Sequence, residues 1–154
     1  MRKENLAMDA MRGWVQSEWE QDPSQSDLLS QMIYKGKILY LLHNFMPEAP
    51  DSILTGYTGS QVKWCESNEK QTWSFFIDQN LLFSNDPQQI AKLIQDGPST
   101  NGFPAGSPGA IGQWIGWKII DAYMKKNSSI TLNQLMMNND YRKIFNESKY
   151  KPLK

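Results

Sequence analysis

Histidine and cysteine are nearly absent from this chain. His43 is the only histidine and Cys65 the only cysteine among its 154 residues. A catalytic zinc site usually takes three protein ligands, and commonly two of them are histidines one helical turn apart. The chain contains no HExxH motif and no CxxC motif, and nothing near His43 resembles the turn that presents a hydrolase nucleophile. We therefore expect no metal site, no cofactor and no catalytic residue, and a structural role for His43.

Net charge and long apolar runs are also missing. Lysine plus arginine and aspartate plus glutamate number 16 each, so the chain lacks the charge that would favour nucleic acid or an anionic membrane. No apolar run approaches the roughly 20 residues that cross a bilayer. The first residues lead directly into an amphipathic pattern, without a signal peptide or a cysteine for lipidation. The chain is expected to be soluble, and either cytosolic by itself or a piece without its targeting segment.

Apolar residues recur at helical spacing along nearly the whole chain. With 154 residues, of which 40% are hydrophobic, the chain suffices for one domain with a core and is too short for two comfortable ones. We predict an all-α fold with residues 1–154 as a single helical domain, a compact bundle of about five main helices and two short C-terminal helices. The main helices are expected from about residue 6 to the stop at 22–24, at 27–46, at 60–80, after Asp86-Pro87, and from Ser107-Pro108 to about 127. Ser26 or Asp27 is expected to cap the second helix, and Thr131 and Asp140 the two short ones.

Two of these helices have apolar faces that predict their packing. On the first helix the apolar residues fall on one half of a helical wheel, opposite Asp9, Arg12 and Gln16. These apolar residues are Leu6, Ala7, Ala10, Met11, Trp14 and Val15. The helix at residues 27–46 is apolar over much of its circumference, which is typical of a central helix.

Glu69 stands at the centre of the apolar stripe of the helix predicted at residues 60–80. The stripe comprises Val62, Cys65, Trp73, Phe76 and Ile77. A carboxylate there is costly unless it is paired or hydrogen-bonded, so we expect a structural acid that a lysine, arginine, tyrosine or backbone donor satisfies. The alternative is an acid that serves a functional cleft, which makes Glu69 a candidate binding residue. Cys65 on the same stripe is expected to be a buried, inert thiol.

The run from Ser107 to Trp117 is the most distinctive one in the chain. Its glycines do not match the GxGxxG or Walker patterns, which argues against phosphate binding. Gly112 and Gly116 stand one helical turn apart. Small residues at this spacing let another helix approach closely, and we predict that a neighbouring helix packs there.

Trp114 falls on the polar side of the same helix, beside Lys118 and Asp121. An aromatic residue next to mixed charges resembles the anchor and the polar rim of an interface. We therefore predict that these three residues contact a partner or a ligand. The alternative is that the loop at residues 97–106 folds over Trp114. In that case the turn at residues 56–59 and the lysine-bearing C-terminal tail become the next candidates.

Seven runs of sequence, spread over nearly the whole chain, resemble one known family. The runs are QMIYKGKILY at residues 31–40, PDS at 50–52, GYT at 56–58, WCESNE at 64–69, LLFSNDP at 81–87, SPGAIGQWIGWKI at 107–119 and SKYKP at 148–152. Together they resemble the GldB-type gliding-motility lipoproteins. The resemblance implies the C-terminal part of a longer envelope protein, anchored by an N-terminal lipid-modified cysteine that is absent here. Met1 is then a truncated or separately encoded start.

The family is associated with surface gliding and with the linked secretion apparatus. It is also distantly similar to helical zinc-peptidase-like proteins that carry an HExxH helix. In that comparison the helix from Ala7 to Trp14 takes the position of the metal helix, and its residues Met8-Asp9-Ala10-Met11 cannot bind zinc. Lys35 stands near the place where such peptidases have an acidic ligand. Both departures favour a fold that has lost, or never had, this chemistry.

Three functions are compatible with these observations. The leading interpretation is a non-catalytic interaction domain of a cell-envelope lipoprotein, with an envelope protein as its partner, no nucleic acid, and membrane contact only through the absent anchor. The alternative is a degenerate or incomplete zinc-metallopeptidase-like domain whose metal site lies upstream or is lost. A third interpretation, glycan or peptidoglycan binding, depends only on six tryptophans and six tyrosines, most of which fit core stripes.

Overall fold

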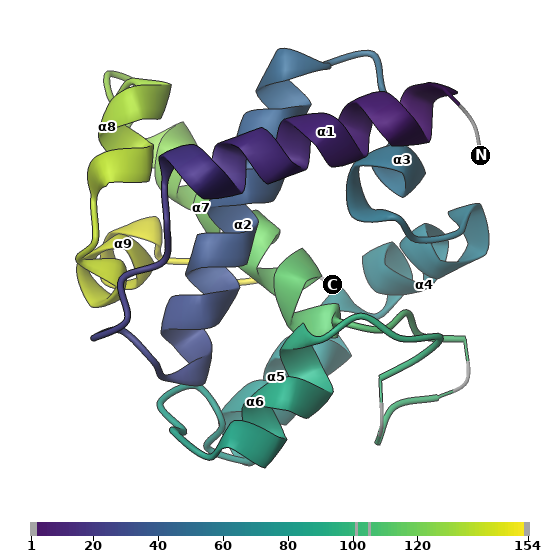
Figure 1. Cartoon of the computed structure of the whole chain (residues 1–154). Coiled ribbons are helices and arrows are strands. Elements are labelled where there is room, and N and C mark those ends of the chain that lie inside the picture. Colours follow the sequence, from purple (N-terminus) through teal and green to yellow (C-terminus); the bar gives the residue numbers. More distant parts are fainter. Residues whose placement is uncertain (1–2, 101, 105, 153–154) are drawn as a thin grey trace.

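Helices form all of the regular structure in the part of the chain that the computed structural model describes, residues 3–100, 102–104 and 106–152 (Figure 1). Their order is α1 (Lys3–Glu18), α2 (Leu28–Phe45), α3 (Asp51–Thr55), α4 (Gly59–Ser67), α5 (Glu69–Asp78), α6 (Pro87–Ile94), α7 (Ile111–Lys126), α8 (Leu132–Met137) and α9 (Tyr141–Ser148). The all-α prediction is confirmed. The predicted five main and two short helices become nine within these residues, because one predicted helix is divided and α3 is not evident in the sequence. None of the nine is long and apolar enough to cross a membrane.

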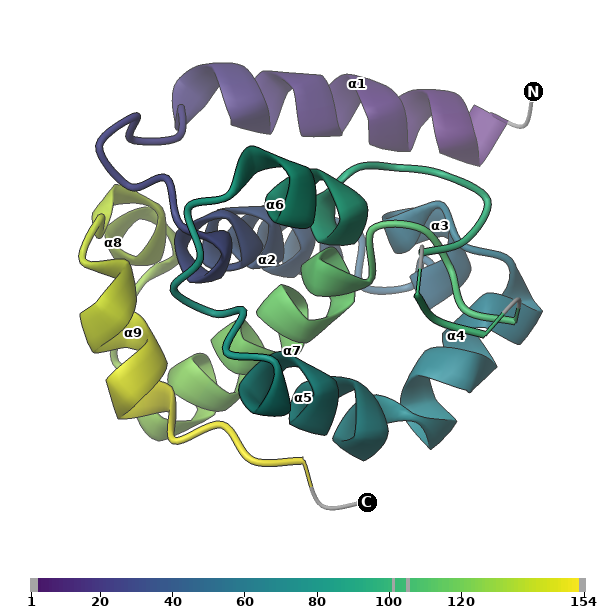
Figure 2. The ribbon, with the colours of Figure 1, turned by 90° about the horizontal axis from the view of Figure 1, so that it is seen from below.

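α2 and α7 cross at the centre of the molecule. Figure 2 shows α1 on the outer side of α2, with α8 and α9 at one end of the central pair and α3 and α4 at the other. The two backbones meet at Gly36 of α2 and Gly116 of α7, where a Cβ added to either glycine would overlap the backbone of the other helix. A Cβ added at Gly112 would lie 2.8 Å from the Leu93 carbonyl oxygen of α6. The predicted close packing at both α7 glycines is therefore confirmed, and so is the central place of α2, most of whose residues are buried.

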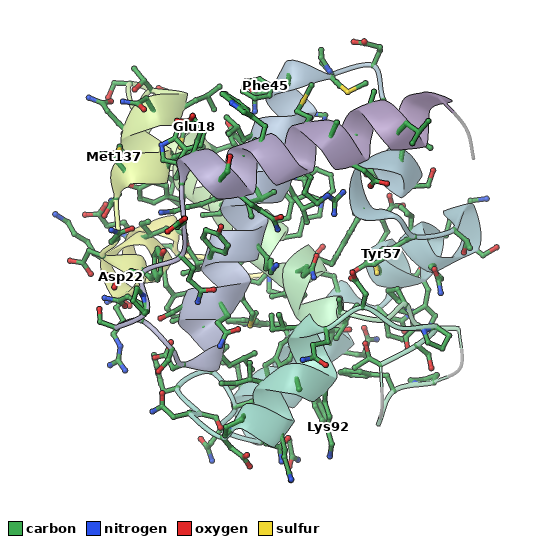
Figure 3. The ribbon with its side chains drawn as sticks, in the orientation of Figure 1. Glu18, Asp22, Phe45, Tyr57, Lys92 and Met137 are labelled. Carbon is green, nitrogen blue, oxygen red and sulfur yellow. The ribbon has the colours of Figure 1, made fainter. Side chains whose placement is uncertain are left out.

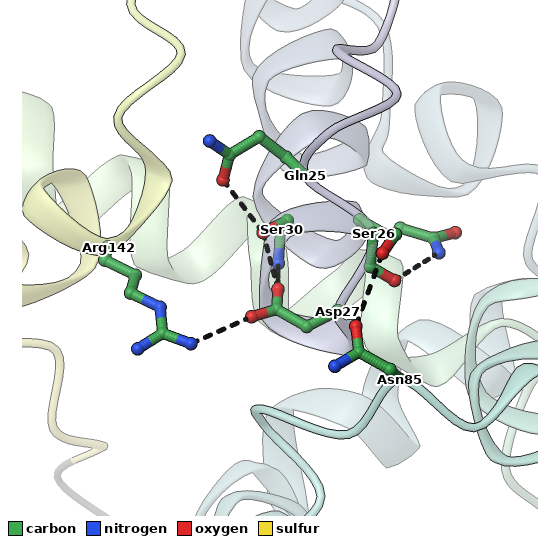
Figure 4. Close-up of polar contacts among 7 residues, drawn as sticks. Gln25, Ser26, Asp27, Ser30, Asn85 and Arg142 are labelled. Atoms are coloured by element: carbon green, nitrogen blue, oxygen red, sulfur yellow. Dashed lines mark hydrogen bonds and ion pairs between the residues drawn. The ribbon is translucent and has the colours of Figure 1, made fainter.

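Asp27 and the preceding Ser26 connect the start of α2 to two distant segments (Figure 4). Its side chain accepts a hydrogen bond from the Ser30 backbone N–H at 2.8 Å, which is the N-cap interaction that the sequence predicts. Its second carboxylate oxygen lies 3.4 Å from Nη2 of Arg142 on α9. Beside it, the Ser26 hydroxyl donates to Asn85, in the segment that precedes α6, at 3.3 Å. The start of α2 is thereby joined to α9 and to the segment that precedes α6.

Most other helix starts also follow the sequence. The caps of α6, α8 and α9 are Asp86, Thr131 and Asp140, as predicted. The exception is α7, which begins at Ile111 rather than at Ser107-Pro108. Ala110 precedes it in the left-handed conformation, with φ of 55°, and this conformation separates the preceding turn from the helix.

The helix predicted at residues 60–80 bends at Asn68, and its two parts are α4 and α5. The Asn68 side-chain amide donates to the Trp64 carbonyl oxygen at 2.9 Å, and the Thr72 hydroxyl donates to the Asn68 carbonyl oxygen at 2.8 Å. Side chains that bond to the backbone in this way compete with regular helix geometry. The pattern of apolar residues does not indicate this bend. Ile77, which was expected on the buried stripe, is 46% exposed.

α1 packs through a narrower face than its apolar pattern predicts. Met8 and Val15 are fully buried, whereas Trp14 is 49% exposed. The exposed apolar residues of this helix are Leu6, Ala7, Ala10 and Trp14. The prediction of a buried apolar half is therefore wrong for these four residues.

Arg12 accounts for the orientation of α1. It was expected on the solvent side, but it is half-buried, and its Nη2 donates to the carbonyl oxygen of the buried Leu54 at 2.5 Å. A charged donor that satisfies a buried carbonyl is a strong contact. With this face turned inward, Trp14 lies outward against Trp19 and Phe45, with ring centroids 5.9 and 6.3 Å from its own. Figure 3 shows Phe45 at the end of α2 next to α1.

Candidate functional site

A groove of about 590 Å³ lies between the second half of α7, the junction of α4 with α5, and the segment that follows α9. We call it the α7 groove. Its lining residues are Glu66, Glu69, Lys118, Asp121, Ala122, Lys125, Lys126, Ser148, Lys149, Tyr150, Lys151 and Pro152. The structure thus brings together three of the four predicted site residues, Glu69, Lys118 and Asp121, with the lysine-bearing C-terminal segment.

One face of α7 forms the first wall of the groove. Lys118, Asp121, Ala122 and Lys125 are spaced three and four residues apart, so their side chains project on the same side of the helix. Nζ of Lys118 lies 3.8 Å from Oδ2 of Asp121, and the two side chains are 24% and 29% exposed. Burial raises the pKa of the Asp121 carboxyl group, while Lys118 and Lys125 act in the opposite direction. The wall therefore presents a partly desolvated ion pair with a further cation one turn away.

Trp114 does not belong to the surface of the groove. It is 1% exposed, and its ring contacts Tyr57 and Trp117, with centroids 6.5 and 5.6 Å away. The prediction that Trp114 anchors a partner is therefore wrong. Its place beside Lys118 was predicted correctly, but Tyr57 from the turn between α3 and α4 packs against the ring. A helical wheel contains no information about that distant residue.

The two buried tryptophan rings instead contact the ammonium group of Lys118. Nζ of Lys118 lies 4.4 Å from the ring centroid of Trp114 and 4.6 Å from that of Trp117. An ammonium group this close to two aromatic faces is held by cation–π attraction. With Asp121 on its other side, Lys118 is fixed in position before any ligand arrives.

Glu69 and Tyr150 join the opposite wall to the C-terminal segment. The Tyr150 hydroxyl donates to Oε2 of Glu69 at 2.7 Å, and the Tyr150 ring lies edge-on to Trp73 with centroids 5.0 Å apart. Burial raises the pKa of the Tyr150 hydroxyl, and the bond to Glu69 raises it further. The expectation that a donor such as tyrosine satisfies Glu69 is confirmed. This contact holds the C-terminal segment alongside α5 (Figure 2).

Four lysines of the groove lack an acidic partner within the described part of the chain. Lys125 and Lys126 lie in the last turn of α7, and Lys149 and Lys151 lie on either side of Tyr150 in the C-terminal segment. All four are exposed, and neither ion pair of the described residues includes them. The sequence analysis missed Lys125, although its spacing of seven residues from Lys118 could have indicated the shared face.

The turn at residues 56–59, the other fallback candidate, lines a separate cavity of about 660 Å³. Asp9 and Arg12 of α1, together with Asp96, contribute its charged groups. The Tyr57 hydroxyl donates to the Ala110 carbonyl oxygen at 2.9 Å beside this cavity. With one arginine and two aspartates in its lining, this cavity has no excess of positive charge, unlike the α7 groove.

Cys65 and His43 lie outside both cavities. Cys65 is 1% exposed, and burial raises the pKa of its thiol to about 12, which fits the inert thiol that the sequence predicts. The His43 ring packs against Trp117 with centroids 6.0 Å apart. Among the described residues, no group of three histidine, cysteine, aspartate or glutamate side chains is placed to hold a metal ion.

A family model described as gliding motility protein GldB matches residues 1–152 of the chain. The chain belongs to this family. The resemblance drawn from the sequence runs is thereby confirmed, and the protein is associated with gliding motility. The family name also indicates a lipoprotein of the cell envelope. Neither a curated protein nor a solved structure matches the chain.

Proposed function

We propose that this chain is a non-catalytic interaction domain of a cell-envelope lipoprotein and that it binds a protein partner in the α7 groove. The observation that carries the proposal is the meeting of three segments of the chain around one group of exposed cations. Family membership supports the envelope location and the association with gliding, and we extend the proposal to the linked secretion apparatus.

Preorganisation supports binding at this place. Lys118 is fixed by two tryptophan rings and Asp121, and the C-terminal segment is fixed through Tyr150 and Glu69. Groups that are already ordered lose little conformational entropy when a ligand binds, so more of the contact energy appears as affinity. The exposed apolar face of α1 is the rival surface, but its residues are not gathered into a groove.

The non-catalytic part of the proposal depends on the residue inventory. His43 and Cys65, the one histidine and the one cysteine, do not line the groove, so among the described residues it holds no pair of nucleophile and base that uses either residue type. The alternative of a degenerate or incomplete zinc-metallopeptidase-like domain depends on distant resemblance alone. Stoichiometric zinc or proteolysis by the parent protein would favour that alternative.

A steric test uses two matched substitutions. Ala122 lies on the α7 wall of the groove and Ala10 on the exposed face of α1. We expect Ala122→Trp in the parent protein to reduce co-purification of its envelope partner at least tenfold, while Ala10→Trp leaves it unchanged. Quantitative mass spectrometry of both variants and of the unsubstituted protein measures this, after circular dichroism has shown that each variant is folded. Loss of the same partner with Ala10→Trp alone would refute the groove as the binding site.

A further inference from the structure

Lysines outnumber acidic residues in the lining of the α7 groove, five to three. Asp121 pairs with Lys118, and Glu69 accepts a hydrogen bond from the neutral Tyr150 hydroxyl, so it keeps its charge. Glu66 and Glu69 therefore offset only part of the charge of the four lysines that have no acidic partner within the described residues. In a chain whose net charge is zero, the groove is therefore a local concentration of positive charge, and such a cleft attracts anions.

The four lysines without an acidic partner among the described residues come from two segments of the lining. Lys125 and Lys126 belong to α7, where they also offset the negative end of the helix dipole. Lys149 and Lys151 belong to the C-terminal segment, and Tyr150 between them holds that segment in place. Together they border a hollow of about 590 Å³ that a chain segment can enter.

The groove is also lined by three carboxylates, which restrict the kind of ligand it can bind. Glu66, Glu69 and Asp121 would repel an uninterrupted polyanion such as a nucleic acid backbone. A peptide places its acidic side chains at intervals, and its backbone N–H groups can donate to carboxylates between them. Ala122 and Pro152 add small apolar contacts to the lining. The groove thus matches a polypeptide with spaced acidic residues.

We propose that the partner of the α7 groove presents an extended acidic peptide segment, whose carboxylates pair with Lys125, Lys126, Lys149 and Lys151. This inference rests on the proposed function, because it names the chemistry of the ligand that the same groove binds. Since the lysines are exposed, the attraction is mainly electrostatic and weakens as salt screens it.

A titration with defined peptides tests this proposal. The ¹⁵N-labelled chain is titrated with an eight-residue peptide of alternating glycine and glutamate, and with matched peptides that carry glutamine or lysine in place of glutamate. We expect the glutamate peptide to bind at least tenfold more tightly than the other two, to shift amide resonances around the groove, and to lose affinity as salt is raised. Equal binding of the three peptides, or shifts confined to another surface, would overturn the proposal.

Matched charge reversals locate the binding. The variant Lys125→Glu with Lys149→Glu is compared with Lys63→Glu with Lys143→Glu, which changes the net charge equally at exposed lysines outside the groove. We expect at least a tenfold loss of affinity for the glutamate peptide in the first variant only. Equal losses in both would show non-specific attraction and would overturn the proposal.

Two further outcomes separate this inference from its alternatives. Vesicles of equal parts phosphatidylserine and phosphatidylcholine should not bind the chain through the groove lysines, and binding lost only in the first variant would reassign the groove to a lipid surface. If Ala122→Trp removes the native partner but the glutamate peptide does not bind, the acidic ligand is refuted and the interaction groove stands. If Ala122→Trp leaves the partner bound, the proposed function itself fails.

Discussion

At the scale of single residues, the hydrogen bond from Tyr150 to Glu69 connects two segments that line the groove and lie far apart in the sequence. Its length of 2.7 Å and the half-buried position of both side chains indicate a stabilising contact. The sequence indicated that Glu69 needs a donor, because an acid on an apolar stripe requires one. It did not indicate which donor, because Tyr150 lies 81 positions further along the chain.

Two substitutions at Glu69 test the strength of this contact. Glu69→Gln should change the free energy of unfolding little, because the amide oxygen still accepts a hydrogen bond from the Tyr150 hydroxyl. Glu69→Leu should lower it by about 1–3 kcal/mol, because the partly buried hydroxyl loses its acceptor. Urea unfolding followed by circular dichroism measures both. If the leucine variant unfolds at the same urea concentration as the unsubstituted chain, the contact does not stabilise the fold.

Lys37 is a buried residue that the sequence analysis did not single out. It is 1% exposed, its Nζ donates to the Asn138 carbonyl oxygen, and it lies 4.7 Å from the ring centroid of Tyr141. Burial lowers the pKa of its amine from 10.5 to about 7. Between these values the unfolded chain holds a proton that the folded chain has released, so stability increases as pH rises through this window.

Lys37→Met should remove this pH dependence. We expect the difference in the free energy of unfolding between the unsubstituted chain and the variant to move in favour of the unsubstituted chain from pH 7 to pH 9.5. Urea unfolding at three pH values in this range measures the difference, in which the titration of other groups cancels. A difference that stays constant across the range would show that Lys37 keeps its proton in the folded state.

At the scale of helices, glycine positions and caps were readable from the sequence, while bends and rotations were not. Gly112 and Gly116 showed close packing through their spacing, and Asp27 showed a cap through its place before an apolar run. The bend at Asn68 is accompanied by side-chain bonds to the backbone. The inward face of α1 carries the bond between Arg12 and Leu54. Both depend on individual polar contacts that hydrophobic periodicity does not encode.

Opposite effects of alanine at two glycines test the helix crossing. Gly116→Ala should lower the free energy of unfolding by about 1–3 kcal/mol or more, because the added methyl group overlaps the Met32 backbone. Gly13→Ala on α1 should raise it by up to about 1 kcal/mol, because an added Cβ there meets nothing within 4 Å and alanine favours helix. Chemical unfolding measures both signs. A Gly116→Ala variant as stable as the unsubstituted chain would contradict the close crossing of α2 and α7.

At the scale of the whole molecule, the groove is assembled from three segments that only the fold brings together. They lie at residues 66–69, 118–126 and 148–152. The sequence indicated Lys118 and Asp121 together, as neighbours of Trp114, and Glu69 by itself for its place on an apolar stripe, and the structure places these three in one groove. The four lysines without an acidic partner in the described part of the chain could not be recognised in advance, because pairing depends on the positions of all neighbouring segments.

We place the envelope partner in the α7 groove rather than on the exposed face of α1. Photo-crosslinking in the native envelope distinguishes the two surfaces, with a benzoylphenylalanine introduced into the parent protein at Ala122 or, separately, at Ala10. We expect one protein to be linked covalently from position 122 and no such product from position 10. A product from position 10 with none from position 122 would place the interface on α1 and refute binding in the groove.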